Sequence, residues 1–371
     1  MADSPAPIPV TQRLVSLDVL RGFDMFWILG MEEFGAALAK ASSSPWAAFA
    51  GQQLDHAEWA GFRFLDLIFP LFIFISGVSL VYSIDKQLTT QSRARVVWRL
   101  LQRALILYVL GLFCYGGFSK GMDAVRWLGV LQRLAICGFA GGLAYIFLKE
   151  RGRAILLVVL LAGYWAAMAL IPVPGVGAGQ FAEGQNLANW VDSQFLGGFK
   201  WDGNHDPEGL LSTLPAIASG LLGVLAGGWL KHHPGSLWRK AGGLALEGLL
   251  LASAGWIMHP YFPVIKKLWT SSFVLVAGGY SLLLLATFLV VVDGWKFQKG
   301  LSPLIWIGMN PITLYLSHHV ISYSKLSHLL LGGPIAHACG AWSGVLFASG
   351  EVLLGIGLAW FLYSRKIFLR V

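Results

Sequence analysis

The fold is decided by the stretch DHAEWAGFRFLDLIFPLFIFISG, residues 55–77. His56 lies between two carboxylates, just before a long apolar run that itself carries Asp66 and Pro70. Such a run predicts a membrane-spanning helix, because roughly 20 mostly apolar residues cross the hydrocarbon core. We therefore expect polar chemistry at the edge of a membrane. The alternative is that His56 is an ordinary interfacial residue.

The composition indicates an integral membrane protein. Of the 371 residues, 56% are hydrophobic and 12% are charged, whereas an ordinary soluble domain carries about 25% charged residues. We expect an all-α, polytopic membrane helix bundle with about ten transmembrane helices (ten to eleven). The ten apolar segments are residues 14–38, 62–84, 97–117, 124–147, 153–172, 210–230, 241–258, 270–292, 302–323 and 343–363.

The domain organisation is expected to be simple. Residues 1–12 contain three prolines and no basic start of the kind that a signal peptide has, so they predict a disordered tail. Residues 13–371 then form a single transmembrane domain, whose longest loop is extracytoplasmic and covers about 172–209. The three cysteines have unrelated spacings, which suggests neither a metal site nor a disulfide framework.

The distribution of Lys and Arg predicts the orientation. With the N-terminus inside, sixteen of these residues lie in cytoplasmic loops and eight in outer loops, which is the bias found in membrane proteins. An even number of spans leaves the C-terminus cytoplasmic and His56 extracytoplasmic. The net charge of +8 is explained by these loops and by anionic membrane lipid. It does not indicate a nucleic-acid partner.

Several charged residues lie within the apolar segments. On one continuous helix, Asp18, Arg21 and Glu32 would share a stripe about 60° wide that rises roughly 21 Å. Charges at membrane depth are costly and usually face the protein interior. Asp18 and Arg21 are either a structural pair or part of a ligand site. Arg133, inside the fourth segment, either neutralises a first-helix acid or meets an anionic ligand.

Polar groups gather at both ends of the expected bundle. At the cytoplasmic end, Arg99 and Arg103 share a helix face and either reach lipid phosphates or hold the phosphates of a nucleotide cofactor. At the outer end, the loop 172–209 is rich in acidic and aromatic residues, which suits an amino sugar but also an ordinary solvated loop. The Asn310-Pro311 pair should break or kink the ninth span. His318 then approaches the outer face.

Five blocks in this order resemble the heparan-alpha-glucosaminide N-acetyltransferase family and its bacterial members. They are SLDVLRG (16–22), HAEW followed by DLIFP (56–70), GVLQR (129–133), DPEG (206–209) and NPITLYLSH (310–318). The first block also opens many other transmembrane acyltransferases. The resemblance implies acetyl-CoA as co-substrate, an amino-sugar or glycan acceptor and a homodimer. It also implies that His56 is the active-site histidine.

The resemblance and the residues together give a set of candidate site residues. Glu32 stands where the family usually carries an asparagine, and a carboxylate there could raise the basicity of His56. Capping of a helix alone could explain Asp206. No metal site is expected. The candidates are catalytic His56, Glu32 and His318; cofactor-binding Asp18, Arg21, Arg103, Arg133 and Asn310; and substrate-binding Trp59, Asp66, Asp206 and Glu208.

These observations predict a transmembrane acetyltransferase of the bacterial cytoplasmic (inner) membrane. It would move acetyl from cytosolic acetyl-CoA to the amine of an extracytoplasmic amino sugar. A bacterial surface glycan is expected, because the chain lacks the luminal extension that the resemblance implies. His56 would act either as a general base or as an acetyl carrier. The alternatives are an O-acetyltransferase of a surface polysaccharide and a secondary transporter of a small anionic solute, which should show an internal repeat. No block occurs twice.

Overall fold

The apolar run that follows His56 forms the central helix of the bundle. In a computed structural model, which describes residues 14–369, the turn η1 (Phe64–Leu67) leads directly into α4 (Ile68–Leu88). Pro70 is the third residue of α4, where a backbone N–H has no partner within the helix. Pro70 therefore marks the start of α4 and does not kink it. The predicted tail, residues 1–12, lies outside the described residues.

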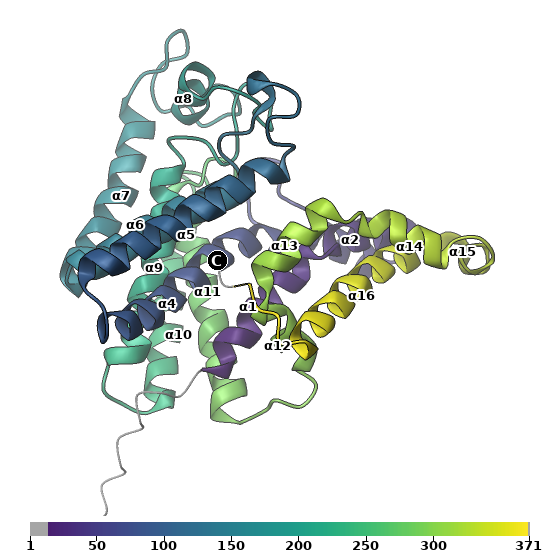
Figure 1. The fold of residues 1–371 in the computed structure, drawn as a ribbon. Coiled ribbons are helices and arrows are strands. Elements are labelled where there is room, and N and C mark those ends of the chain that lie inside the picture. The colour runs from purple at the N-terminus through teal and green to yellow at the C-terminus, as the bar shows by residue number, and fades with distance from the viewer. Residues whose placement is uncertain (1–13, 370–371) are drawn as a thin grey trace, which may run out of the picture.

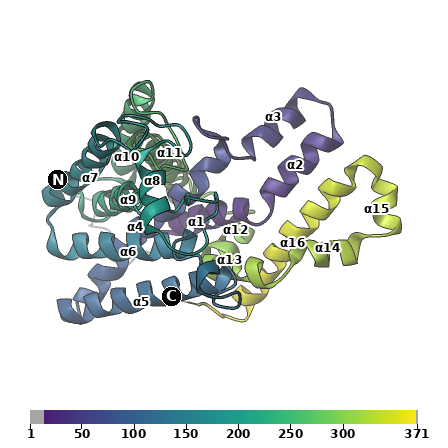
Figure 2. The ribbon, with the colours of Figure 1, turned by 90° about the horizontal axis from the view of Figure 1, so that it is seen from above.

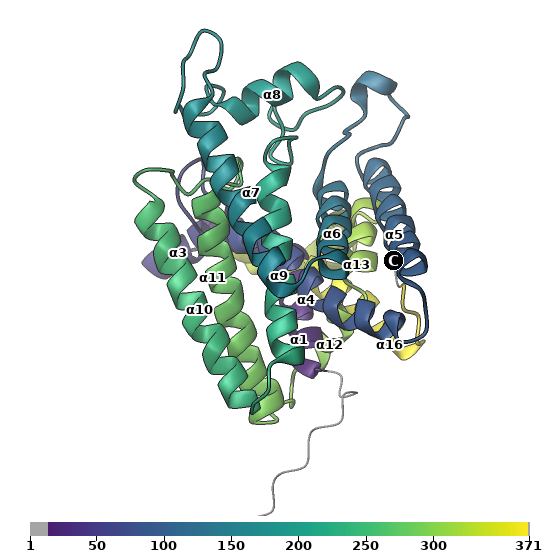
Figure 3. The same ribbon diagram turned by 90° about the vertical axis from the view of Figure 1, so that its left-hand side faces the viewer.

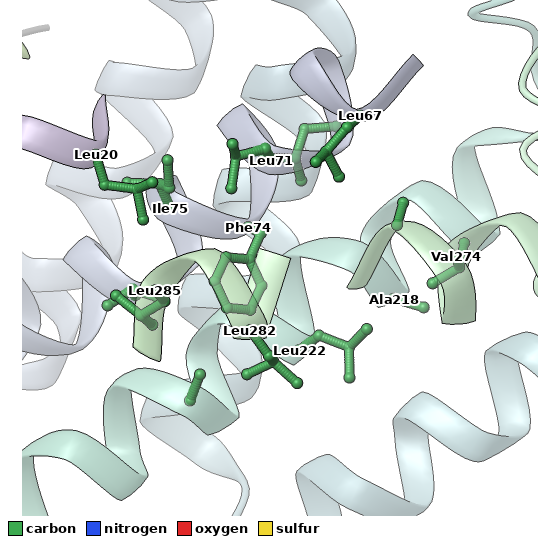
Figure 4. Packing of buried hydrophobic residues seen from close by; sticks show 14 of the residues in the cluster. Leu20, Leu67, Leu71, Phe74, Ile75, Ala218, Leu222, Val274, Leu282 and Leu285 are labelled. Carbon is green, nitrogen blue, oxygen red and sulfur yellow. The ribbon is translucent and has the colours of Figure 1, made fainter. Parts of the chain in front are cut away.

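Helix α4 packs closely against α9 (Thr213–His232) and α11 (Ser271–Phe288). A Cβ atom on Gly223 of α9 would lie 2.0 Å from the carbonyl oxygen of Phe74, so these two helices touch through their backbones. Figure 4 shows Phe74 among Leu222 of α9 and Leu282 of α11, all of them buried. The hydrophobic core thus joins segments that lie far apart in the sequence.

Within the described residues, eight helical stretches are long and apolar enough to cross a membrane. They confirm an all-helical bundle (Figure 1); its count of spans and its orientation stay predictions. The eight stretches are Phe64–Leu88 (η1 and α4), Arg93–Cys114 (α5), Val130–Phe147 (α6), Glu150–Leu170 (α7), Thr213–His232 (α9), Leu237–Met258 (α10), Ser271–Gly294 (α11 and η3, Leu289–Gly294) and Pro334–Ser364 (α15, η4 and α16).

The first of the ten predicted spans is not one helix. Helix α1 (Val15–Ile28) ends before Gly30, which has a φ of 103°, and α2 (Met31–Ala41) begins after it. Glycine adopts this left-handed conformation without steric cost. The predicted stripe from Asp18 to Glu32 is therefore wrong, because the two residues belong to different helices.

The ninth predicted span is also divided, as the Asn310-Pro311 pair predicts. Helix α12 (Ser302–Met309) ends at Asn310 and α13 (Pro311–Val320) begins with Pro311. An arm built from two separate parts of the chain projects from the bundle (Figure 2). The arm consists of α2, α3 (Pro45–Gln53), α14 (Tyr323–Leu331), α15 (Pro334–Cys339), η4 (Gly340–Trp342) and α16 (Ser343–Ser364).

Three loops meet at one end of the bundle. The predicted long loop contains the short helix α8 (Leu187–Phe195) and lies above α7 and α9 (Figure 3). The loop before α4 pairs with the loop between α10 and α11, since Ala60 and Ile265 form an isolated antiparallel β-bridge. Trp59 donates a hydrogen bond from Nε1 to the carbonyl of Phe181, 2.9 Å away. These contacts place His56 beside residues from all three loops.

Candidate active site

A cavity of about 660 Å³ opens where these loops meet. Its wall combines the α1–α2 junction, the loop that carries His56, the end of α5, the start of α6 and one face of α13. Of the predicted site residues, four line it: His56, Glu32, His318 and Glu208. Its polar groups are mixed with aromatic side chains that include Trp27 and Trp201. The cavity is large enough for a small-molecule site.

His56 is held by Asp66. The two side chains are 3.0 Å apart between Nδ1 and Oδ1, and the Asp66 carboxylate is fully buried. Its other oxygen accepts the backbone N–H groups of Arg63 and Ala57, at 2.9 and 3.2 Å. An ionised carboxylate can only accept hydrogen bonds, so Asp66 favours the tautomer of His56 that carries its proton on Nδ1 and keeps a lone pair on Nε2. The partner of His56 is therefore Asp66 and not Glu32.

Lys266 approaches the same imidazole from the loop between α10 and α11. Its Nζ lies 2.9 Å from Nδ1 and 3.1 Å from Nε2 of His56, and 3.5 Å from Oδ1 of Asp66. Burial lowers the pKa of Lys266, and the carboxylate of Asp66 partly opposes that shift. The sequence does not predict this contact, because Lys266 lies in a loop and outside the five blocks that resemble the family.

A second group of charges is built around Arg126. Its guanidinium donates to both carboxylate oxygens of Asp206, at 2.9 and 2.7 Å, and to Oε2 of Glu208 at 2.6 Å. It also lies over the ring of Tyr115, 4.4 Å from the centroid. Burial alone would lower the pKa of Arg126, but the hydrogen bond to Asp206 and the charge of Glu208 raise it. The guanidinium is thus a permanent cation.

The DPEG block forms a turn around Arg126. Asp206 also accepts the backbone N–H of Trp201 and of Glu208, both at 3.0 Å, whereas α9 begins only at Thr213. Asp206 therefore does not cap that helix. Glu208 projects into the cavity, where burial raises the pKa of its carboxyl group.

The cavity is also lined by Glu32 and Glu33 from the first turn of α2 and by His318 from α13. The ring of His318 stacks on Tyr323 with centroids 5.5 Å apart. Its Nδ1 atom is buried and has no hydrogen-bond partner among the described residues. A second histidine and two carboxylates therefore line the same cavity as His56.

Comparisons with known proteins show the family of this chain. Residues 13–239 match the family model described as "Heparan-alpha-glucosaminide N-acetyltransferase, catalytic". The chain belongs to this family. It is 28% identical to the heparan-alpha-glucosaminide N-acetyltransferase of Homo sapiens and 26% identical to that of Mus musculus, in each case over 85% of this chain. Those matches cover 55% and 56% of the two relatives, so the chain spans about half their length.

In this member of the heparan-alpha-glucosaminide N-acetyltransferase family, the residues predicted to bind the cofactor lie outside the cavity. Arg21 donates to Ser79 of α4, to the carbonyl of Gly308 and to Asp18, at 3.0, 3.1 and 3.3 Å. Arg103 of α5 is exposed and close enough to Arg21 for their charges to interact. None of these side chains lines the cavity.

Two further predicted cofactor residues make contacts within the protein. Arg133 is fully buried and donates to Ser212 and to the carbonyl of Gly209, while its guanidinium lies over Trp269. It therefore holds the start of α9 and meets no first-helix acid. Asn310 donates from Nδ2 to the carbonyl of Ile367 at 3.1 Å. Both residues support elements that form the cavity.

Two predicted substrate residues also have protein partners. Trp59 fastens the long loop through its bond to Phe181, and Asp66 is sealed beneath His56. Sequence signals for the missed residues are weak. Arg126 precedes the GVLQR block and follows Asp123, and Lys266 lies in a twelve-residue connection between α10 and α11. Neither position shows which side chain it will meet.

One cluster within the described residues has the composition of a metal site. Glu183, Asp202 and His205 offer ligand atoms within 4.8 Å of one another. The ammonium of Lys267 lies 3.2 Å from Glu183 and 3.1 Å from Asp202, and these contacts raise the pKa of Lys267 against the opposing effect of its burial. A lysine thus supplies positive charge to these carboxylates. That no metal is required stays a prediction.

Proposed function

We propose that this protein is a transmembrane acetyltransferase that moves an acetyl group from cytosolic acetyl-CoA to the amine of an extracytoplasmic amino sugar. The observation that carries the proposal is the His56–Asp66 pair on the wall of a cavity at one end of a membrane helix bundle. The names of the relatives support an N-acetyltransferase acting on glucosaminides. The excess of Lys and Arg in the opposite loops supports an extracytoplasmic His56.

The chemistry requires a base, because a protonated amine is not a nucleophile. Nε2 of His56 keeps its lone pair while Asp66 accepts the proton of Nδ1, as a general base requires. The neutral amine attacks the thioester carbonyl and forms the N–C bond while Nε2 takes a proton from its nitrogen. The C–S bond then breaks, and the imidazolium gives this proton to the leaving thiolate, which leaves an amide and free CoA thiol. In the alternative route, Nε2 attacks the thioester first, and acetyl-histidine then transfers its acetyl group to the amine.

The acceptor site is proposed in the cavity beside Glu32, Glu33 and Glu208. Carboxylates attract the ammonium form of an amino sugar, and the faces of Trp27 and Trp201 suit a sugar ring. His318 lines the same cavity and would shuttle protons or position the acceptor. This arrangement favours an amine over a neutral hydroxyl acceptor.

For the donor, we propose that its phosphates meet Arg21 and Arg103. Two neighbouring guanidinium groups repel each other, and an anion between them would relieve that repulsion. Ser79, which contacts Arg21, lies about 10 Å further along α4 than Phe72 of the cavity wall, at 1.5 Å per residue. The pantetheine arm of acetyl-CoA is long enough to bridge this gap. We further propose a homodimer in the bacterial cytoplasmic membrane, in contact with lipid.

The proposal is tested with purified protein in detergent, radiolabelled acetyl-CoA and glucosamine. Wild type should form N-acetylglucosamine, and His56→Ala should not. His337→Ala is the control, because His337 lies on α15 in the arm, away from the cavity. Equal product from wild type and His56→Ala would remove His56 from the reaction. Labelling of N-acetylglucosamine, whose amine is already blocked, would instead indicate an O-acetyltransferase.

A further inference from the structure

Lys266 makes an unusual contact with His56. Its Nζ lies 2.9 Å from Nδ1 and 3.1 Å from Nε2 of the imidazole. A lysine that merely paired with Asp66 would approach the carboxylate most closely, yet Nζ is 3.5 Å from Oδ1 of Asp66. The ammonium is thus placed against the imidazole itself. The acetyl transfer proposed above assigns no role to Lys266.

The backbone around Lys266 is held in place. Ile265 pairs with Ala60, the N–H of Gly61 donates to the carbonyl of Val264 at 2.9 Å, and the hydroxyl of Thr270 donates to the carbonyl of Pro263 at 2.8 Å. Only 20% of the Lys266 side chain is exposed, so solvent screens its charge weakly. The loop therefore delivers a positive charge to one fixed position.

That charge has a definite effect on proton binding. A positive charge beside an imidazole disfavours its protonated form, whereas a carboxylate favours it. Asp66 alone would promote a charged His56, which has no lone pair with which to accept a proton. The other charged or titratable groups near His56 are Asp55, Glu58 and Arg63 of its own loop and, on the cavity wall, Glu32, Glu33, Tyr115, Arg126, Asp202, Glu208, Lys267, Tyr315, His318 and His319.

We propose that Lys266 is a positioning residue that keeps the imidazole of His56 neutral at pH values where Asp66 alone would leave it protonated. While the site is empty, the ammonium can donate to Nε2. When an acceptor binds, the ammonium is displaced from that lone pair. The inference rests on the proposed acetyl transfer for its purpose, but the protonation state of His56 can be measured without any transfer.

The test uses diethyl pyrocarbonate, which modifies neutral but not protonated imidazole. The rate of modification of His56 is followed against pH by peptide mass spectrometry in detergent-solubilised wild type, Lys266→Met and Lys266→Arg. The midpoint for His56 in Lys266→Met should move to higher pH by about one unit or more. Lys266→Arg keeps the charge and should stay close to wild type. His318, mapped in the same samples, should keep its midpoint.

Lys267→Met is the matched control. It removes the same charge from the next residue, but Lys267 pairs with Glu183 and Asp202 and has no hydrogen bond to His56. An equal shift in this variant, or no shift in Lys266→Met, overturns the inference. Variants are compared only if they elute as folded protein, and Lys266→Gln is a second uncharged variant should Lys266→Met fail to fold.

Kinetics separate this inference from the proposed function. In the acetyl-transfer assay, the acid limb of the kcat/KM profile should move to higher pH in Lys266→Met. Titration of the acceptor amine is common to all variants, so the difference reports the enzyme. A wild type that transfers no acetyl, but whose His56 midpoint still shifts without Lys266, contradicts the proposed function alone. A transferase whose profile and modification midpoint do not move contradicts only the role of Lys266.

Discussion

Replacing Asp66 by asparagine changes the tautomer of His56 while preserving the shape of the site. Asp66 accepts three hydrogen bonds, from Nδ1 of His56 and from the backbone N–H groups of Ala57 and Arg63. An asparagine oxygen can keep the backbone bonds, but its amide then presents a donor to Nδ1. The imidazole would have to accept at Nδ1 and carry its proton on Nε2, which removes the lone pair that faces the reaction.

The size of the expected fall in kcat/KM follows from the hydrogen bond lost between Nδ1 of His56 and Asp66. A hydrogen bond to a charged group contributes about 1.5–3 kcal/mol, and each 1.36 kcal/mol corresponds to a factor of ten in rate. We expect kcat/KM for acetyl transfer from acetyl-CoA to glucosamine to fall about 10- to 150-fold in Asp66→Asn. The thermal midpoint should fall too, because Lys266 loses its nearest carboxylate.

Asp55→Asn is the matched control for Asp66→Asn. Asp55 also contacts His56 and Arg63, but it does so through the backbone N–H of His56 at 2.7 Å and the guanidinium of Arg63 at 3.0 Å. Its side chain is 60% exposed. We expect a change of less than about fivefold, since exposed ion pairs contribute about 0–1 kcal/mol and 1.36 kcal/mol corresponds to a factor of ten. Equal losses in both variants, or full activity in Asp66→Asn, would refute the reasoning.

Three further predictions concern stability, measured by thermal unfolding in detergent. Arg126→Lys breaks the two-pronged contact with Asp206 and should lower the free energy of unfolding by about 3 kcal/mol or more. Arg63→Lys, at the exposed pair with Asp55, should lower it by under about 1 kcal/mol. Similar losses in the two variants would contradict the greater contribution assigned to the buried pair. Gly223→Ala places a methyl group against the carbonyl of Phe74 and should cost about 1–3 kcal/mol, while Gly163→Ala, with no atom within 4 Å, should cost nothing. Burial raises the pKa of the Asp192 carboxyl group from 3.8 to about 6. As the pH falls from 7 to 5, the folded state therefore binds this proton before the unfolded state does. Over that range, the free energy of unfolding of wild type should rise by about 1 kcal/mol relative to that of Asp192→Asn. A constant difference across that range would refute the assignment to Asp192.

Sequence patterns predicted the elements better than their continuity. Apolar runs of about 20 residues predicted the long helices, and the Asn310-Pro311 pair predicted the break between α12 and α13. The break at Gly30 was missed, because a single glycine inside an apolar run is compatible with a continuous helix. Gly30 adopts its left-handed conformation without steric cost, so the sequence permits the break but does not require it.

The site was partly predictable for a similar reason. His56 and Asp66 are ten residues apart, and each was recognised from its own block, but their contact requires the turn η1 between them. Lys266 is 210 residues from His56 and reaches it through a pairing of two loops that has no sequence signature. Arg133 had a recognisable motif, but only the structure shows that Ser212 and Gly209 receive its hydrogen bonds.

The shared core of α4, α9 and α11 limits how the chain can be divided. The match to the family model ends at residue 239, yet Phe273, Val274 and Leu282 beyond it are buried against the matched segment. A fragment cut there would present a bare apolar groove along α4 and would also lack Lys266. Minimal versions of this protein for engineering must therefore keep α10 and α11, and also α2 of the arm, which carries Glu32 and Glu33.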